Sequence, residues 1–278
     1  MTELTVLITG ATDGLGRAVA KALAAEGATL LLHGRSFEKL AATKSEIETT
    51  TGNTNVTTFL ADFAELDQVR KLAADVIAST DRLDVLLDNA GIGSGLPDLT
   101  TRQTSADGYE LRFAVNYLAG FLLTQELLPL LIASAPSRIV LVSSIGQAPI
   151  DFEDVMLERH YSGRQAYAQS KLAQINYGFE LASRLEGTGV TVNSFHPGTY
   201  MPTKIVVSGA THSVDSLETG VDSALWMIES PDLDGVTGHF YDRKQETWVE
   251  LQAHGADPRA RLWNLSRNLT NAPDVPTL

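Results

Sequence analysis

The sequence has 278 residues, a formal net charge of −13 and no cysteine. The acidic balance argues against a nucleic-acid binder, because contact with a phosphate backbone requires a basic face. The lack of cysteine excludes disulfides, thiolate metal ligands and thiol nucleophiles. Hydrophobic residues make up 44% of the chain and charged residues 20%, which is ordinary for a globular protein with a sizeable core.

Short apolar runs alternate with longer helical patterns along the whole chain. Strands are predicted at 4–9, 29–33, 56–60, 85–89, 138–143, 191–195 and around 239–241. Helices are predicted at 15–26, 36–50, 64–79, 107–133, 163–186 and 216–229. The alternation indicates right-handed βαβ units, and the continuous apolar runs are typical of strands buried on both faces. We therefore predict an α/β fold: one doubly wound, Rossmann-type parallel sheet of about seven strands with helices on both faces, spanning residues 1–278.

No targeting or membrane signal stands out. The stretch MTELTVLITG lacks the basic region and the cleavage site of a signal peptide. The apolar run YLAGFLLTQELLPLLIA comes nearest to a membrane span but is interrupted by Gln125, Glu126 and Pro129. We expect a soluble, cytoplasmic protein without a membrane span.

The first predicted strand leads into a glycine-rich turn, TGATDGLG. In open parallel sheets, ligands bind beyond the carboxyl ends of the strands. Gly10, Gly14 and Gly16 let the backbone turn tightly and approach a ligand. The helix that follows offers free N–H groups and the positive end of its dipole to a pyrophosphate. Because such turns are often only turns, this feature alone leaves cofactor binding open.

The second and third strand ends carry polar residues suited to an adenosine. Binders of NAD usually place a carboxylate after the second strand, whereas a basic residue there accommodates a 2′-phosphate. Here Arg35 and Ser36 follow without a carboxylate at the strand tip, which favours NADP(H); the alternative is a solvated loop charge. Asp62, after the third strand, is placed to accept from an adenine amino group, to cap the helix beginning near Ala64, or to do both.

The next three strand ends carry small residues and hydroxyls. The fourth is followed by Asn89, Ala90 and Gly91, a turn that a flat cofactor could lie against. The fifth ends in the pair at 143–144, two serines, and the sixth leads to a bend at 197–198, a proline and a glycine. Six successive strand ends thus carry chemistry suited to a ligand.

Tyr167 and Lys171 are four residues apart in a predicted helix, so they lie on one face. They are either a solvated surface pair or a tuned proton donor. A phenol with a pKa of about 10 is a poor proton exchanger at neutral pH. A neighbouring ammonium and an oxidised nicotinamide both favour the phenolate and together lower that pKa toward the operating range. Tyr161 is less suitable, because Gln165, four residues on, supplies no charge.

These motifs together resemble the short-chain dehydrogenase/reductase family. The matching pieces appear in the family's order: TGATDGLG, DNAG, the asparagine of FAVNYLAG, VSS, YAQSK and HPG. The strand-end Arg35 and the run SKLAQINYGFELASRL resemble the retinol-dehydrogenase-like branch. A Tyr-x-x-x-Lys spacing arises easily by chance, so the ordered set carries the resemblance.

The resemblance implies a role for each catalytic position. Tyr167 is the implied general acid/base, Lys171 its electrostatic partner and a ribose ligand, and Asn116 the holder of a relay water. Ser144, rather than Ser143, is implied to bind the substrate oxygen. No metal site is expected. The cofactor-binding set expected from the strand ends and the resemblance is Gly10, Thr12, Asp13, Gly14, Leu15, Gly16, Arg35, Ser36, Asp62, Phe63, Asn89, Ala90, Gly91, Tyr167, Lys171, Pro197, Gly198, Thr199 and Thr203.

The chain departs from the family pattern in three places. Ser144 and Tyr167 are 23 positions apart, and the extra stretch at about 148–165 resembles an insertion that we expect beside the substrate mouth. Asp88 stands where an asparagine is common. Either Thr199 or Thr203 is expected to touch the carboxamide, within a lid predicted at about 199–218.

We therefore expect an NADP(H)-dependent oxidoreductase that interconverts a carbonyl and an alcohol. The insertion and the lid suggest a hydrophobic substrate of medium size, through Ile150, Phe152, Met156, Leu157, Ile205 and Val206. The alternative is a catalytically silent NADP(H)-binding sensor or scaffold, although such relatives usually lose the tyrosine or the lysine. The helices at 107–133 and 163–186 resemble those through which relatives pair, so a homodimer or homotetramer is a further expectation.

Overall fold

The computed structural model describes residues 4–95, 99–199, 201 and 214–276. Its strands form a single sheet in the order β3-β2-β1-β4-β5-β6-β7-β8. All neighbours are parallel except β7 and β8. The strands are β1 (Thr5–Ile8), β2 (Thr29–Gly34), β3 (Val56–Leu60), β4 (Val85–Asp88), β5 (Ser137–Val142), β6 (Val190–His196), β7 (Phe240–Asp242) and β8 (Gln245–Glu246). The predicted doubly wound fold is confirmed, with the two-residue β8 as an additional edge strand.

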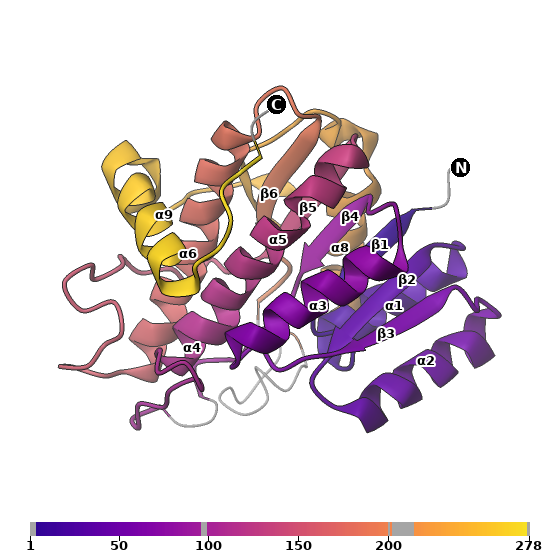
Figure 1. Cartoon of the computed structure of the whole chain (residues 1–278), viewed down its shortest axis with the longest axis horizontal. Helices are drawn as coiled ribbons and strands as arrows, with labels where there is room; N and C mark the ends of the chain where they lie inside the picture. The colour runs from indigo at the N-terminus through magenta and orange to yellow at the C-terminus, as the bar shows by residue number, and fades with distance from the viewer. Residues whose placement is uncertain (1–3, 96–98, 200, 202–213, 277–278) are drawn as a thin grey trace.

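Helices cover both faces of this sheet (Figure 1). They are α1 (Gly14–Ala25), α2 (Phe37–Thr51), α3 (Leu66–Ser79), α4 (Leu111–Phe113), the π-helix η1 (Ala114–Leu118), α5 (Ala119–Ala133), α6 (Gly163–Arg184), α8 (Leu217–Glu229), the 3₁₀ helices η2 (Pro231–Leu233) and η3 (Leu251–His254), and α9 (Ala256–Thr270). Side chains alternate across β1, so Val6 and Ile8 pack in one core and Leu7 in the other. The first core joins the sheet to α1, α2 and α8, and the second joins it to α3, α5, α6 and α9.

The long apolar helical stretch Leu111–Ala133 belongs to the second core. Within the described residues, it is the one stretch long and apolar enough to cross a membrane, yet 78% of its most apolar window is buried inside the protein. The helix lies against α3 and α6. Its apolarity therefore serves packing in the interior of the fold.

The C-terminal helix α9 was not predicted from the sequence. It packs on α6, and the Trp263 ring lies 5.5 Å from Phe121 of α5 and 6.0 Å from Tyr177 of α6. The Arg184 guanidinium lies 4.1 Å from the Trp263 ring centroid. The tyrosine Tyr109, which precedes α4, donates to the backbone carbonyl of Leu269 at 2.8 Å. Helix α9 therefore covers part of α5 and α6, the helices through which we expected copies of the chain to pair.

Candidate active site

Helix α6 brings Tyr167 and Lys171 together at the carboxyl ends of the strands. The Lys171 ammonium lies 5.9 Å from the centroid of the Tyr167 ring, so the two side chains share one face of the helix. Lys171 Nζ donates to the carbonyl of Val142 at 3.0 Å and to Gln174 Oε1 at 2.8 Å. With only 6% of its surface exposed, the lysine is held in a fixed position beside the phenol.

Burial sets the protonation of this pair. It lowers the pKa of Lys171 to about 8, against the opposing pull of the Asp88 carboxylate, so the ammonium is still charged at pH 7. Burial also raises the pKa of Tyr167, and a hydrogen bond with Ser144 only partly offsets this effect. Burial therefore outweighs the contributions of the protein's own groups that favour the phenolate, and the charge of an oxidised nicotinamide would have to bring the pKa of Tyr167 down.

The two serines after β5 differ in what their hydroxyls do. Ser143 Oγ donates to the backbone carbonyl of Lys171 at 2.8 Å, which ties β5 to α6. Ser144 Oγ accepts from Gly146 N at 3.0 Å, and the same side chain is near enough to the Tyr167 phenol to oppose the rise in its pKa. Ser144 is thus the serine that faces the phenol, as its predicted role requires.

Asn116 lies in η1, and π-helical turns are common at functional sites. Its Oδ1 accepts from Ile92 N at 2.8 Å, while Nδ2 donates to Ile92 O at 3.1 Å and to Ser170 Oγ at 3.0 Å. The amide therefore joins the loop after β4 to α6. Its predicted role as the holder of a relay water stays a prediction.

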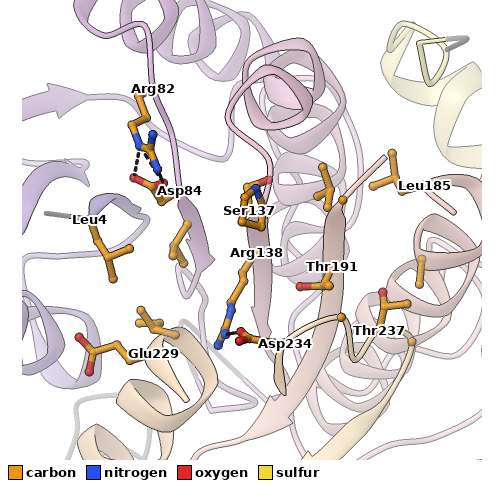
Figure 2. A pocket seen from close by; sticks show the side chains of 18 of the residues that line it. Leu4, Arg82, Asp84, Ser137, Arg138, Leu185, Thr191, Glu229, Asp234 and Thr237 are labelled. Atoms are coloured by element: carbon orange, nitrogen blue, oxygen red, sulfur yellow. Dashed lines mark hydrogen bonds and ion pairs between the residues drawn. The ribbon is translucent and has the colours of Figure 1, made fainter. Parts of the chain in front are cut away.

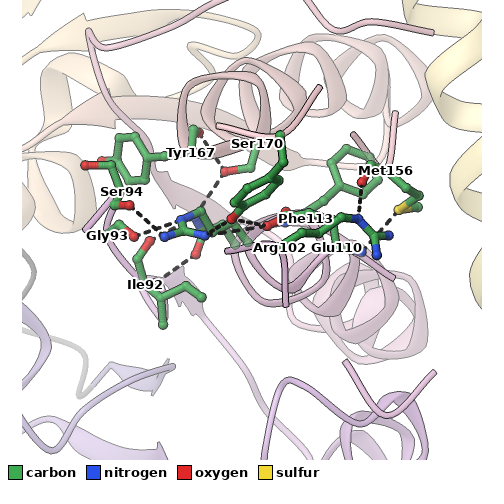
Figure 3. A network of polar contacts seen from close by, with 12 residues as sticks. Ile92, Gly93, Ser94, Arg102, Glu110, Phe113, Met156, Tyr167 and Ser170 are labelled. Atoms are coloured by element: carbon green, nitrogen blue, oxygen red, sulfur yellow. Dashed lines mark hydrogen bonds and ion pairs between the residues drawn. The ribbon is translucent and has the colours of Figure 1, made fainter. Parts of the chain in front are cut away.

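A buried arginine next to this asparagine was missed by the sequence analysis. Arg112 is fully buried, donates to the carbonyls of Gly93 at 3.0 Å and Ser94 at 2.6 Å, and pairs with Glu110 at 3.7 Å. It also contacts the hydroxyl of Tyr161, which bonds in turn to Glu110 at 3.3 Å. Figure 3 shows this network around Gly93, Ser94 and Glu110. The network fastens the loop after β4 to the insertion that precedes Tyr167.

The insertion contributes more to the core than we expected. Ile150 and Leu157 are only 3% and 4% exposed, and Ile150 belongs to the second core. Their expected place beside the substrate mouth stays a prediction. Phe152 and Met156 are partly buried against the same core.

The glycine loop packs tightly against the turn after β4. Gly10 and Gly14 have φ values of +67° and +49°, in the left-handed region that favours glycine. A Cβ on Gly16 would lie 2.5 Å from the Gly10 carbonyl oxygen and 2.5 Å from Asn89 Nδ2. Asn89 Nδ2 also donates to Thr9 O at 2.8 Å, which anchors the loop. The first turn of α1 begins directly after it, with the Asp13 carboxylate accepting from Gly14 N at 2.9 Å.

His33, at the end of β2, is a second residue that the sequence analysis missed. Its Nδ1 accepts from Gly10 N at 3.4 Å and its Nε2 bonds to Ala61 O at 3.0 Å. Its ring stacks on that of Phe63, with 4.3 Å between the ring centroids, and the predicted contact of Phe63 with the cofactor stays a prediction. Burial lowers the pKa of His33 to about 4, so the ring is neutral at pH 7 and joins three strand ends. Leu15, in the first turn of α1, is buried in the first core, and its predicted contact with the cofactor stays a prediction.

The polar residues after β2 and β3 lie as follows. Arg35 is exposed, and Ser36 caps α2 by accepting from Lys39 N at 3.3 Å. Asp62 Oδ1 accepts from Ala64 N at 2.9 Å and so shapes a turn. The expected capping of α3 by Asp62 is wrong, because α3 begins at Leu66. The Thr12 methyl packs near Gly34, at the junction of the first two strand ends.

After β6 the chain bends at Pro197 and Gly198. Thr199 N donates to Asp215 Oδ2 at 2.6 Å, and Thr199 Oγ1 lies 3.1 Å from His196 Nε2. Thr203 and most of the predicted lid at 199–218, including Ile205 and Val206, lie outside the described residues. The choice between Thr199 and Thr203 therefore stays open.

A surface hollow of about 1320 Å³ lies at the opposite edge of the sheet (Figure 2). Its lining comes from the amino ends of β4, β5 and β6 and includes two ion pairs, Arg82 with Asp84 and Arg138 with Asp234, each at 2.6 Å. None of the predicted site residues that the structure describes lines it. The hollow is therefore separate from the chemistry at the carboxyl ends.

Comparison with known proteins places this arrangement in a family. The model of the family described as short chain dehydrogenase matches residues 4–212. Human Retinol dehydrogenase 13 is 36% identical, covering 98% of this chain and 86% of that protein, and human Retinol dehydrogenase 11 is 35% identical, covering 96% and 86%.

Solved structures agree with the fold. A crystal structure of an uncharacterized protein from Mycobacterium paratuberculosis has a TM-score of 0.79 at 30% identity, covering 99% of this chain and 95% of that one. An Escherichia coli protein described as a short chain dehydrogenase complexed with NADPH has a TM-score of 0.72 at 29% identity, covering 88% and 98%.

Proposed function

The chain belongs to the short-chain dehydrogenase/reductase family, in its retinol-dehydrogenase-like branch, and from this premise we propose that it is an NADP(H)-dependent oxidoreductase interconverting a carbonyl and an alcohol. One observation carries the proposal: Ser144, Tyr167 and Lys171 lie together beside the carboxyl end of β5. A phenol, a hydroxyl and a buried ammonium in one place supply a proton, a hydrogen bond and a positive charge.

In carbonyl reduction, Tyr167 gives its proton to the carbonyl oxygen, and the hydride to the carbon would come from a bound dinucleotide. The raised pKa of Tyr167 keeps that proton in place until the oxygen becomes basic. Ser144 donates a hydrogen bond to the same oxygen as negative charge develops there. Lys171 stabilises the phenolate that remains, because its ammonium is charged at neutral pH.

The residues present fit a dinucleotide. Gly10 and Gly16 leave no Cβ between the loop and the turn after β4, so the two segments pack closely and hold the loop in place at the amino end of α1. The amino end of α1, with the positive end of its dipole, faces the loop and suits a pyrophosphate. Exposed Arg35 suits a 2′-phosphate, which supports NADP(H), and structural relatives complexed with NADP and NADPH support the same choice.

We propose a hydrophobic substrate, because the relatives at about 35% identity are named for retinol, a largely apolar alcohol. A cytoplasmic location is also part of the proposal, and the burial of Leu111–Ala133 within the protein argues only that this stretch packs in the interior. Fractionation of cells that express the tagged chain tests it, and recovery in the membrane pellet would contradict it.

The test of the function is a titration followed by an activity assay. Tryptophan fluorescence of the purified chain is titrated with NADPH and with NADH, and a panel of apolar aldehydes and ketones is then screened by absorbance at 340 nm. Tighter NADPH binding with turnover supports the proposal. Tight binding without turnover across the panel would favour the sensor or scaffold, and preference for NADH would contradict the role of Arg35.

A further inference from the structure

A buried carboxyl group lies within reach of Lys171. Asp88, the last residue of β4, is 4% exposed, and its Oδ1 accepts from Thr9 Oγ1 at 3.2 Å. Its Oδ2 lies 3.5 Å from Gln174 Nε2, and Gln174 Oε1 accepts from Lys171 Nζ at 2.8 Å. One amide therefore bridges the carboxyl group and the ammonium in a continuous chain.

Helix α5 makes room for this carboxyl group. A Cβ on Gly120 would lie 2.2 Å from Asp88 Oδ2, so no larger residue fits at position 120 without moving the carboxyl group. Asp88 is thereby enclosed between β1, α5 and α6. A charge in such a place is costly unless it is paired.

The titratable groups around Asp88 and Lys171 are neutral at pH 7, so these two residues are each other's charged partners. Burial raises the pKa of Asp88 to about 6, and the charge of Lys171 opposes this rise. Tyr177 and Tyr167 of α6 are phenols whose pKa values are raised by burial, so they are neutral at pH 7. His196 of β6, whose pKa burial lowers to about 4, is neutral as well. At pH 7 an ionised Asp88 thus faces a protonated Lys171 through the amide of Gln174.

We propose that Asp88 is a positioning residue of the active site, which acts through Gln174 to hold Lys171 in place and to keep its ammonium charged beside Tyr167. The inference rests on the proposed function and adds a residue to it. An asparagine at position 88 could accept from Thr9 in the same way but would carry no charge. The aspartate therefore matters to the chemistry of the lysine as well as to the packing of the sheet.

The kinetic test is the pH profile of Asp88→Asn, which is nearly isosteric. Because Lys171 has a lower pKa than Tyr167, loss of its proton sets the alkaline limb of kcat/KM for carbonyl reduction with NADPH. Removing the carboxylate moves this limb at least about one pH unit lower. Adding Gln174→Glu restores the limb, because it places a carboxylate directly on Lys171. A loss of activity by the same factor at every pH would show a structural role and overturn the proposal.

A second measurement does not depend on turnover. The carboxyl ¹³C signal of Asp88, assigned by its absence in Asp88→Asn, is titrated in the wild type and in Lys171→Met. The proposal predicts an upward shift of about one pH unit in the variant, because the neutral methionine no longer favours the carboxylate. An unchanged titration would overturn the coupling. If the wild type turns over no substrate, the proposed function fails while this titration still decides the role of Asp88.

Folding of the variants is checked by thermal melting at pH 6. If Asp88→Asn does not fold, Gln174→Met takes its place in the kinetic test, because it removes the bridge and leaves the carboxyl group. The alkaline limb then shifts in the same direction if Asp88 acts through Gln174. An unshifted limb in a folded Gln174→Met protein would overturn the bridge.

Discussion

The hydroxyl groups of two tyrosines near the site have different roles, one structural and one proposed to be catalytic. Two tyrosines lie within seven positions of each other, Tyr161 before α6 and Tyr167 inside it. The hydroxyl of Tyr161 is committed to Arg112 and Glu110, whereas that of Tyr167 faces Ser144. Each therefore serves as the matched control for the other.

Tyr167→Phe should retain NADPH binding and lose turnover by about 10²–10⁴-fold, the usual contribution of a general acid. Tyr161→Phe should keep turnover and lose about 1 kcal/mol of stability through its hydrogen bonds. Steady-state kinetics and fluorescence titration of both variants check this expectation. Substantial activity in Tyr167→Phe would move the proton donor elsewhere.

The burial of His33 predicts that the stability of the fold decreases at acid pH. Its pKa falls from 6.5 to about 4 on folding, so the unfolded chain binds the proton more readily. Stability is thus fully present above about pH 6.5 and is lost as the pH falls toward about 4, by roughly 3 kcal/mol for this group. His196, with a pKa lowered to about 4 by burial, acts in the same window.

The contribution of His33 to this loss of stability is measured by comparing the wild type with His33→Gln. Glutamine keeps a donor and an acceptor but does not titrate. Urea unfolding from pH 7 to pH 4 measures it. The variant should lose less free energy of unfolding over this range than the wild type. Equal losses in the two proteins would contradict the assignment.

At the scale of elements, the glycine loop and α1 form one unit with the turn after β4. Gly16→Ala should push the loop away from Asn89, with an overpacking cost of about 1–3 kcal/mol and a weaker NADPH affinity. Arg17→Ala, at the next position of the helix, breaks only a surface ion pair with Glu46 and should cost under about 1 kcal/mol. Equal NADPH affinities in the two variants would show that the close packing at Gly16 does not shape the cofactor site.

Most elements could be predicted because their apolar runs are continuous or periodic. The predicted helix at 107–133 instead begins at Leu111, since Gly108 has a φ of +85°, and it contains the π-turn η1, which periodicity does not encode. Site residues such as Tyr167 and Lys171 were proposed from their spacing within local motifs. Arg112 and His33 were not, because their roles come from carbonyls and amides 18 to 28 positions away in the chain.

At the scale of the whole molecule, the C-terminal helix α9 covers part of the outer surface of the helices α5 and α6. Apart from Leu262 and Trp263, the buried side chains of α9 are Ser266 and Thr270, so its pattern gave little amphipathic signal. In the structure it lies along α6 (Figure 1) and places Trp263 between aromatic rings of α5 and α6. A homodimer that used this face would have to displace α9 or include it.

Trp263→Ala tests whether Trp263 holds α9 against α5 and α6. Trp263 is 2% exposed, so its loss should cost about 3–5 kcal/mol of the free energy of unfolding, measured by chemical denaturation. Trp248, which is 61% exposed, is the matched control, and Trp248→Ala should change stability by less than about 0.5 kcal/mol. Loosening α9 also uncovers Phe121 and Tyr177, so light scattering should show more self-association in Trp263→Ala than in the wild type. A wild-type dimer that falls apart in Trp263→Ala would show instead that α9 is part of the pairing surface.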